Sequence, residues 1–155
     1  MQEKNQMEPV RQHHGEFQVA GLTARTKNSE ENDAATARIG PLWNRFFTEE
    51  TYRSTPHRTQ DARIFGVYSG YESDAHGAFD VTVGVAVSDG TGAVGIEAGD
   101  YLVFSGQGEM PHMVIDTWQR IWQYFEANPT ITRRYRSDFE AYDGPDKVAI
   151  HIGIS

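Results

Sequence analysis

Two glutamates that follow aromatic residues are the side chains of this sequence best suited to chemistry. Glu72 comes after Tyr68 and Tyr71, and Glu140 comes directly after Phe139. A carboxylate among aromatic rings loses hydration, which is unfavourable unless a cation or a hydrogen bond compensates its charge. Such a carboxylate can attract a cationic guest, and each aromatic face adds about 0.5–2 kcal/mol of cation–π attraction. These residues therefore favour a binding site for a cation.

Two other interpretations of the same carboxylates stay open. Either glutamate could form an ion pair with an arginine at a strand end and serve the structure alone; the candidates are Arg63, Arg134 and Arg136. Two carboxylates near one pocket could also act as general acid and base. The separation of the two glutamates is not given by the sequence, so an enzyme stays an alternative.

Other catalytic and metal chemistry has little support. The six histidines show no metal-ligand spacing, and no serine occupies a nucleophile-elbow pattern. Gly90-Thr91-Gly92 is not followed by the lysine-bearing helix of a phosphate loop. The chain has no cysteine, which excludes disulfides, thiolate nucleophiles and cysteine-ligated clusters. We therefore expect no catalytic residue, no metal and no cofactor.

Length and charge limit the partners of the protein. The 155 residues suit one domain, and 22 acidic against 14 basic side chains give a net charge of −8. This balance argues against non-specific binding to nucleic acid or anionic lipid. No apolar run approaches the ~20 residues that span a bilayer, and residues 1–16 do not resemble a signal peptide. We expect a soluble, cytoplasmic protein that binds neither membrane nor DNA directly.

Hydrophobic periodicity predicts the elements that position the two glutamates. Alternating segments predict strands, and apolar residues at helical spacing predict two helices, over 35–48 and 111–128. The predicted strands span 16–22, 64–72, 79–88, 94–105, 134–142 and 148–154. The order is strand–helix–strand–strand, twice.

The two halves of the chain also align as an internal repeat. Three segments of the first half match three of the second: Leu42–Phe46 with Ile121–Phe125, Tyr71–Glu72 with Phe139–Glu140, and Val81–Val85 with Val148–Ile152. We predict an α+β fold of two duplicated β-α-β-β units around a pseudo-two-fold axis, with an antiparallel sheet and two helices on one face. Residues 1–15 would be a polar tail and 16–155 one domain, with half-repeats at about 16–89 and 94–155.

Five short segments occur in the order known from one protein family: Ile39–Phe47, Val67–Asp74, Gly99–Phe104, Trp118–Trp122 and Asp138–Tyr142. In these segments the chain resembles the integron-associated effector-binding proteins, part of the wider gyrase-inhibitor-like group. The resemblance extends from Phe17 to Ile154. It implies an apolar, aromatic pocket along the pseudo-two-fold, with a buried glutamate that meets cationic, amphipathic drugs or effectors.

The resemblance also implies which residues form the site. Glu72, in Tyr-Glu-Ser-Asp, and Glu140, in Asp-Phe-Glu-x-Tyr, stand at the positions of the ligand-binding glutamate. The expected aromatic walls are Trp43, Tyr71, Tyr101, Phe104, Trp118, Trp122 and Tyr142.

The function that the resemblance implies is non-catalytic binding of a cationic, amphipathic small molecule. Many relatives carry a helix-turn-helix domain, which the polar residues 1–15 cannot form, so we expect a stand-alone effector-binding domain without direct DNA binding. Two alternatives remain: a hydrolase of strained, cyclopropane-bearing compounds, and an inhibitor of a protein partner such as a gyrase. Association with a protein partner or a second copy of the chain also stays open.

Overall fold

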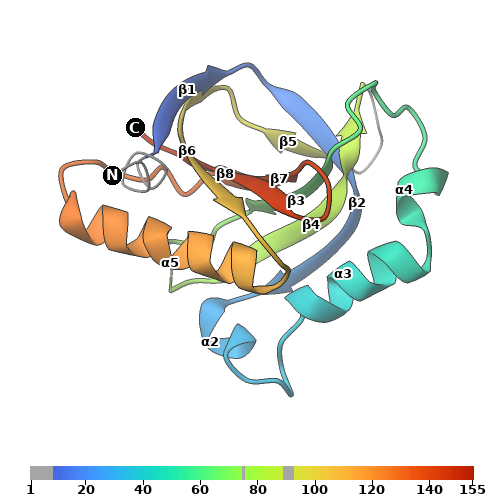
Figure 1. Ribbon diagram of the computed structural model, residues 1–155, viewed down its shortest axis with the longest axis horizontal. Helices are drawn as coiled ribbons and strands as arrows, with labels where there is room; N and C mark the ends of the chain where they lie inside the picture. The colour runs from blue at the N-terminus through green and yellow to red at the C-terminus, as the bar shows by residue number, and fades with distance from the viewer. Residues whose placement is uncertain (1–8, 75, 89–92) are drawn as a thin grey trace.

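One curled, antiparallel sheet of eight strands dominates the computed structural model, which describes residues 9–74, 76–88 and 93–155 (Figure 1). The strands are β1 (Val10–His14), β2 (Phe17–Thr26), β3 (Ile64–Ser69), β4 (Phe79–Val87), β5 (Val94–Ile96), β6 (Gly99–Gln107), β7 (Ser137–Tyr142) and β8 (Lys147–Gly153). The helices are α2 (Asn28–Glu31), α3 (Ile39–Thr48), α4 (Thr51–Ser54) and α5 (His112–Ala127). No helix in these described ranges is long and apolar enough to cross a membrane.

The order of the strands confirms the predicted duplication. The sheet runs β1-β6-β8-β7-β3-β4-β2-β5, so each half contributes three neighbouring strands, β6-β8-β7 and β3-β4-β2. The two halves meet at the central antiparallel pair of β3 and β7. Each half also contributes its main helix, α3 or α5. Strands β1 and β5 extend the sheet at its two ends.

The registers of the strands correct part of the predicted repeat. Val81 on β4 pairs with Tyr68 on β3, and Val148 on β8 pairs with Tyr142 on β7. Because Val81 and Val148 are equivalent in the sequence repeat, Tyr68 and Tyr142 are equivalent too.

The same registers identify the counterpart of Glu140. Val83 pairs with Gly66, and Ile150 pairs with Glu140, so the position equivalent to Glu140 is Gly66. The predicted equivalence of Glu72 and Glu140 is therefore wrong. Glu72 lies beyond the end of β3, in a turn where its backbone N–H donates to the carbonyl of Ala78.

The two faces of the sheet bury separate groups of side chains. Helix α3 buries Leu42 and Phe46 against one face, and α5 buries Met113 and Ile121 against the same face. The N-terminal ends of α3 and α5 come close together there (Figure 1). The other face lines the inside of the curl, where its own side chains pack together, so α3 and α5 cover only one face.

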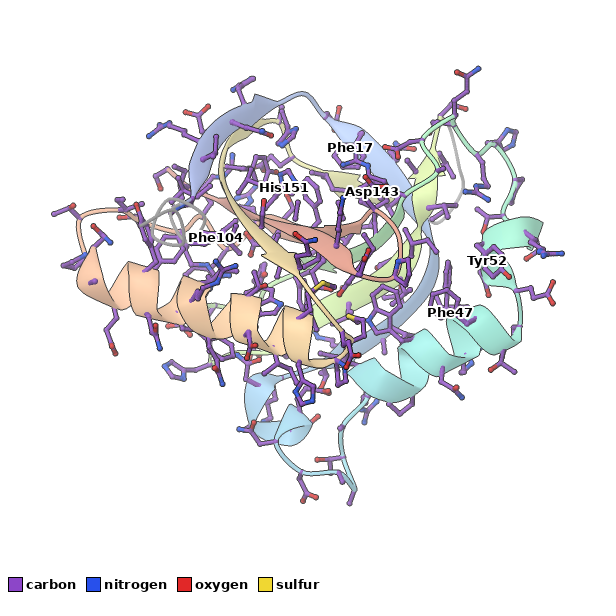
Figure 2. The ribbon with its side chains drawn as sticks, in the orientation of Figure 1. Phe17, Phe47, Tyr52, Phe104, Asp143 and His151 are labelled. Carbon is purple, nitrogen blue, oxygen red and sulfur yellow. The ribbon has the colours of Figure 1, made fainter. Side chains whose placement is uncertain are left out.

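The interior of the curl forms a second aromatic core. Phe139 stacks on His151, with ring centroids 4.2 Å apart, and Tyr101 packs edge-on against Phe139 at 5.7 Å. Figure 2 shows Phe17 and His151 within the curl, away from the helices, and Phe104 on the side of α5. Alternate residues of each strand therefore belong to different cores.

Strand β1 corrects the expectation of a loose tail over residues 1–15. Val10–His14 pair with β6, and residues 1–8 of that expected tail lie outside the described part of the chain. The Arg11 Nη2 and His13 Nδ1 atoms contact the Asp100 carboxylate at 2.8 and 2.9 Å. An edge strand held by its backbone and by polar partners needs few apolar residues, which is why its sequence does not look like a strand.

Candidate functional site

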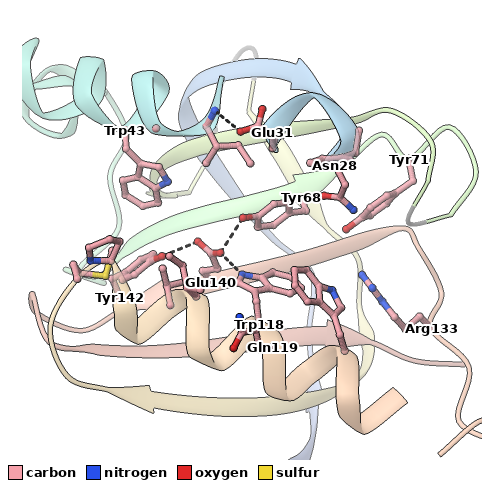
Figure 3. Close-up of a pocket in the computed structure, with 18 of the residues that line it drawn as sticks. Asn28, Glu31, Trp43, Tyr68, Tyr71, Trp118, Gln119, Arg133, Glu140 and Tyr142 are labelled. Carbon is pink, nitrogen blue, oxygen red and sulfur yellow. Dashed lines mark hydrogen bonds between the residues drawn. The ribbon is translucent and has the colours of Figure 1, made fainter. Parts of the chain in front are cut away.

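A cavity of about 570 Å³ lies between α3, α5 and the central strands (Figure 3). This volume falls in the range of small-molecule sites, roughly 300–1,000 Å³. Its walls are mainly aromatic and apolar, and the exposed side chains of Met110, Ile115 and Trp122 belong to the same lining. The cavity therefore offers an apolar interior that opens past apolar side chains to solvent.

Glu140 is the polar centre of this cavity. Its side chain lies on β7 and is buried, with 3% of the residue exposed. The carboxylate accepts three hydrogen bonds, from the Tyr68 hydroxyl at 2.9 Å, the Trp118 Nε1 at 2.7 Å and the Tyr142 hydroxyl at 2.8 Å. Figure 3 shows these three donors converging on the two oxygens. These three hydrogen bonds are the polar contacts that the described side chains make with the carboxylate.

No basic side chain forms an ion pair with Glu140 anywhere in the described ranges. The arginines that could have neutralised it have other partners: Arg63 pairs with Asp61 at 2.9 Å, and Arg134 and Arg136 pair with Glu97. The purely structural interpretation of Glu140 as half of a strand-end ion pair is therefore wrong.

Burial and hydrogen bonding act in opposite directions on Glu140. Burial raises the pKa of the Glu140 carboxyl, and the three donors lower it, with Trp118 contributing most; the net shift is upward. Burial and the nearby carboxylate also raise the pKa of Tyr68 and of Tyr142. The two phenols consequently remain protonated and keep donating to Glu140.

Two tyrosine–tryptophan pairs flank Glu140 and repeat across the pseudo-two-fold. The Tyr68 ring meets Trp118 edge-on at 5.4 Å, and the Tyr142 ring meets Trp43 edge-on at 5.2 Å. Each pair joins one half of the chain to the other. Since Tyr68 and Tyr142 are equivalent, Trp118 is the counterpart of Trp43, which corrects the predicted match of Trp43 with Trp122.

Gly66 makes room for the carboxylate. A Cβ atom at Gly66 would lie 2.8 Å from Glu140 Oε1 and 3.1 Å from Trp43 Cζ2. Both distances are shorter than an ordinary van der Waals contact, so any other residue at Gly66 would displace Glu140 or Trp43.

The structure brings together six of the nine expected site residues. The residues that line the cavity are Glu140, Trp43, Tyr71, Trp118, Trp122 and Tyr142. Glu72 lies outside the lining and is exposed, with its Oε1 accepting the Ala78 backbone N–H at 3.2 Å, so the expectation of a second buried glutamate is wrong. Tyr101 lies in the core inside the curl and Phe104 in the core beneath α5, so neither is a wall of the cavity.

A second polar group on the lining, Arg133, was not expected from the sequence. Only 10% of its side chain is exposed, and Nη2 donates to Asp138 Oδ2 at 2.9 Å. Asp138 is fully buried and also accepts the Tyr71 hydroxyl and the Gly153 backbone N–H. Nothing local in the sequence distinguishes Asp138, because two of the groups that anchor it, the Gly153 N–H and the Tyr71 hydroxyl, are distant in the chain.

Glu31 is the other charged residue of the lining, and the start of α3 holds it in place. Its carboxylate accepts the backbone N–H groups of Arg38 and Ile39, at 2.8 and 3.1 Å, and the Thr26 hydroxyl at 2.6 Å. These are the unpaired donors at a helix N-terminus, which favours a negative charge. Glu31 therefore fixes the rim between α2 and α3, and its charge is already compensated.

The described residues contain no group of three or more His, Cys, Asp or Glu side chains that could hold a metal ion. The arrangement that remains is an aromatic cage with one buried carboxylate at its centre.

Comparison with known proteins assigns the chain to a family. The family model described as integron-associated effector binding protein matches residues 13–154. The crystal structure of an integron cassette protein from the mobile metagenome of Vibrio cholerae is 34% identical, covers 96% of each chain and superposes with a TM-score of 0.81. The Bacillus subtilis protein YobU is 28% identical over 147 residues, 88% of this chain and 89% of its own. SAV2435, solved bound to tetraphenylphosphonium, is 19% identical, covers 96% of this chain and 94% of its own, and shares the fold with a TM-score of 0.77. The chain therefore belongs to the integron-associated effector-binding protein family.

Proposed function

We propose that this protein binds an amphipathic organic cation in the aromatic cavity, with Glu140 as the counter-ion. The observation that carries the proposal is the buried Glu140 carboxylate, which has three hydrogen-bond donors and no basic partner in the described part of the chain. The folded protein already bears the cost of burying this charge, so a cation that enters gains its attraction without that cost. The rings of Trp43 and Trp118 add cation–π attraction.

The hydrogen bonds of Glu140 also favour one kind of cation. A carboxylate has about four acceptor positions, and three are occupied by Tyr68, Trp118 and Tyr142. A guest that needs several acceptors, such as a primary ammonium, would have to displace these donors. A quaternary or delocalised cation needs only charge and aromatic contact, so the cavity suits that class best.

Two further points support binding over turnover. The acid–base pair that an enzyme could have used does not form, because Glu72 lies outside the cavity. The second carboxylate on the lining, Glu31, is occupied by the start of α3. The family is one of effector-binding proteins, and a structure with the same fold holds tetraphenylphosphonium, which makes that cation the first probe to use.

Titration with tetraphenylphosphonium tests the proposal. We expect saturable binding that changes the tryptophan fluorescence, because Trp43 and Trp118 form the walls. Glu140→Gln keeps the shape and removes the charge, and we expect it to weaken binding by about 2–5 kcal/mol. Glu72→Gln is the matched control, since it removes one exposed carboxylate outside the cavity, and it should bind like the wild type. Equal binding by the wild type and Glu140→Gln would contradict the role of Glu140.

A further inference from the structure

We infer that the physiological ligand is an amphipathic cation that also carries a hydrogen-bond acceptor, such as a carboxylate, which Arg133 binds. This inference rests on the proposed function and adds a second recognition group to the same cavity. It starts from a feature that simple cation binding does not explain: a cavity for cations that is also lined by a guanidinium.

Arg133 and Glu140 occupy different parts of one lining. In Figure 3, Arg133 lies on the opposite side of the cavity from Trp43 and Tyr142, with Glu140 between them. A ligand held at Glu140 by its charge can therefore extend past Trp118 toward Arg133. The positive group and the acceptor would lie at separate points of an elongated molecule.

The guanidinium of Arg133 has N–H donors that no described residue accepts. A guanidinium carries five N–H donors, and within the described residues Arg133 uses only Nη2, toward Asp138. Its Nε is buried without a hydrogen-bond partner, and only 10% of the side chain is exposed. Buried donors of this kind are costly unless an acceptor meets them. Nothing else that the structure describes supplies such an acceptor to Arg133.

Arg133 is also held in a fixed orientation. Its guanidinium lies over the Tyr135 ring, with Cζ 4.3 Å from the ring centroid. Its partner Asp138 is anchored by the Gly153 N–H at 2.8 Å and by the Tyr71 hydroxyl. A planar guanidinium that is already ordered binds a carboxylate with little further loss of side-chain entropy. Arg133 is therefore already ordered for an acceptor that enters the cavity.

The consequence for ligand choice follows from these unpaired donors. A purely apolar or cationic ligand end would leave the N–H groups of Arg133 without an acceptor. A carboxylate would accept charge-assisted hydrogen bonds from them, which are stronger than neutral ones. Because Asp138 already balances the charge of Arg133, a neutral acceptor such as a carbonyl would also bind there, though more weakly. The preferred ligand class is therefore a cation with a distant carboxylate.

Two matched probes test this inference: carboxybutyl-triphenylphosphonium, which is zwitterionic at neutral pH, and pentyl-triphenylphosphonium, which has the same shape without the carboxylate. We expect the wild type to bind the carboxylate probe about tenfold more tightly, equivalent to about 1.4 kcal/mol. In the double variant Arg133→Met/Asp138→Asn, which removes both charges together, we expect the ratio of the two dissociation constants to fall to about one.

Controls separate the possible failures. Arg136→Met removes an exposed arginine outside the cavity lining, and its ratio should match that of the wild type. If the double variant does not fold, Arg133→Lys replaces it, and we expect its ratio to fall at least severalfold because an ammonium lacks the planar fork. Equal or weaker binding of the carboxylate probe by the wild type, or an unchanged ratio without Arg133, would overturn the acceptor site alone. Failure of the wild type to bind the pentyl probe would instead overturn the cation pocket.

Discussion

Gly66 and Glu140 stand directly opposite each other on the central strands β3 and β7, at equivalent positions of the two half-repeats. One position supplies the buried carboxylate, and the other supplies the space that the carboxylate occupies. Two large side chains cannot meet at this point, because a Cβ at Gly66 would already lie 2.8 Å from Glu140 Oε1. The duplicated fold thus places a single charge between two equivalent tyrosine–tryptophan pairs.

Gly66→Ala should disturb both stability and binding. The added methyl group pushes on Glu140 and Trp43, and overpacking of this kind destabilises by about 1–3 kcal/mol. We expect a lower melting temperature and at least about tenfold weaker binding of tetraphenylphosphonium, because the carboxylate leaves its three donors. Gly95→Ala is the control, since a Cβ there meets nothing within 4 Å. Unchanged binding by Gly66→Ala would show that the close approach does not matter.

The affinity for a permanent cation should depend on pH. Because the pKa of Glu140 is raised, the proton and the cation compete for the same carboxylate as the pH falls. Tetraphenylphosphonium cannot titrate, and the raised pKa values of Tyr68 and Tyr142 keep both phenols neutral. We expect the affinity to fall as the pH drops through the pKa of Glu140, to reach a plateau above it, and to be nearly constant in Glu140→Gln. Calorimetry should also detect proton release when the cation binds.

The same shift has a consequence for stability without ligand. A carboxyl whose pKa is higher in the folded than in the unfolded protein stabilises the fold at low pH, and this contribution is lost as the pH rises through the folded value. Relative to Glu140→Gln, the wild type should therefore become less stable as the pH increases toward neutrality. Denaturant melts of both proteins at several pH values measure the difference, and a difference of the opposite sign would contradict the raised pKa.

Trp118→Phe should act mainly through Glu140. The change keeps an aromatic wall but removes the Nε1–H that donates to Glu140 at 2.7 Å. Because this bond lowers the pKa of Glu140 more than either tyrosine does, its loss should move the pH midpoint of cation binding upward. Trp122→Phe is the control, since Trp122 is 53% exposed on the same helix and makes no hydrogen bond to Glu140 in the described structure. A midpoint that moves equally in both variants would argue against the role of Trp118.

The core inside the curl should make the protein sensitive to acid. Burial, His14 and Arg63 together lower the pKa of His151 to about 3, and His14 Nε2 lies 2.9 Å from His151 Nδ1. In the unfolded chain the histidine regains its ordinary pKa of about 6.5, so protons favour the unfolded state as the pH falls below that value. We expect the wild type to lose stability from about pH 6.5 downward, and His151→Gln, which does not titrate, to lose less. Parallel acid slopes for the two proteins would assign the loss to other groups.

Local pattern alone was sufficient to predict most of the strands, the two long helices and the duplication. The alternation in Phe79–Val87 and the helical spacing in His112–Ala127 are properties of neighbouring residues, and they match β4 and α5. The order of elements then leads to two similar half-domains, as the sheet confirms. Strand β1 was missed because its stability comes from β6 and from Asp100, which are distant in the chain.

The identity of the site was decided by the pairing of distant strands. The sequence places Glu72 and Glu140 in similar aromatic surroundings, and nothing local distinguishes them. Only the registers of β3 with β4 and β7 put Gly66 opposite Glu140 and leave Glu72 in an exposed turn. Tyr101 was assigned to the wrong face of the sheet: alternation separates the two faces of a strand, but the curl of the sheet determines which face the helices cover. Phe104 does lie on the helix-covered face, but it packs against Tyr124 and Phe125 of α5, outside the cavity lining. Side-chain type and spacing along the chain thus determined the chemistry that was possible, and contacts between residues far apart in sequence decided where it was assembled.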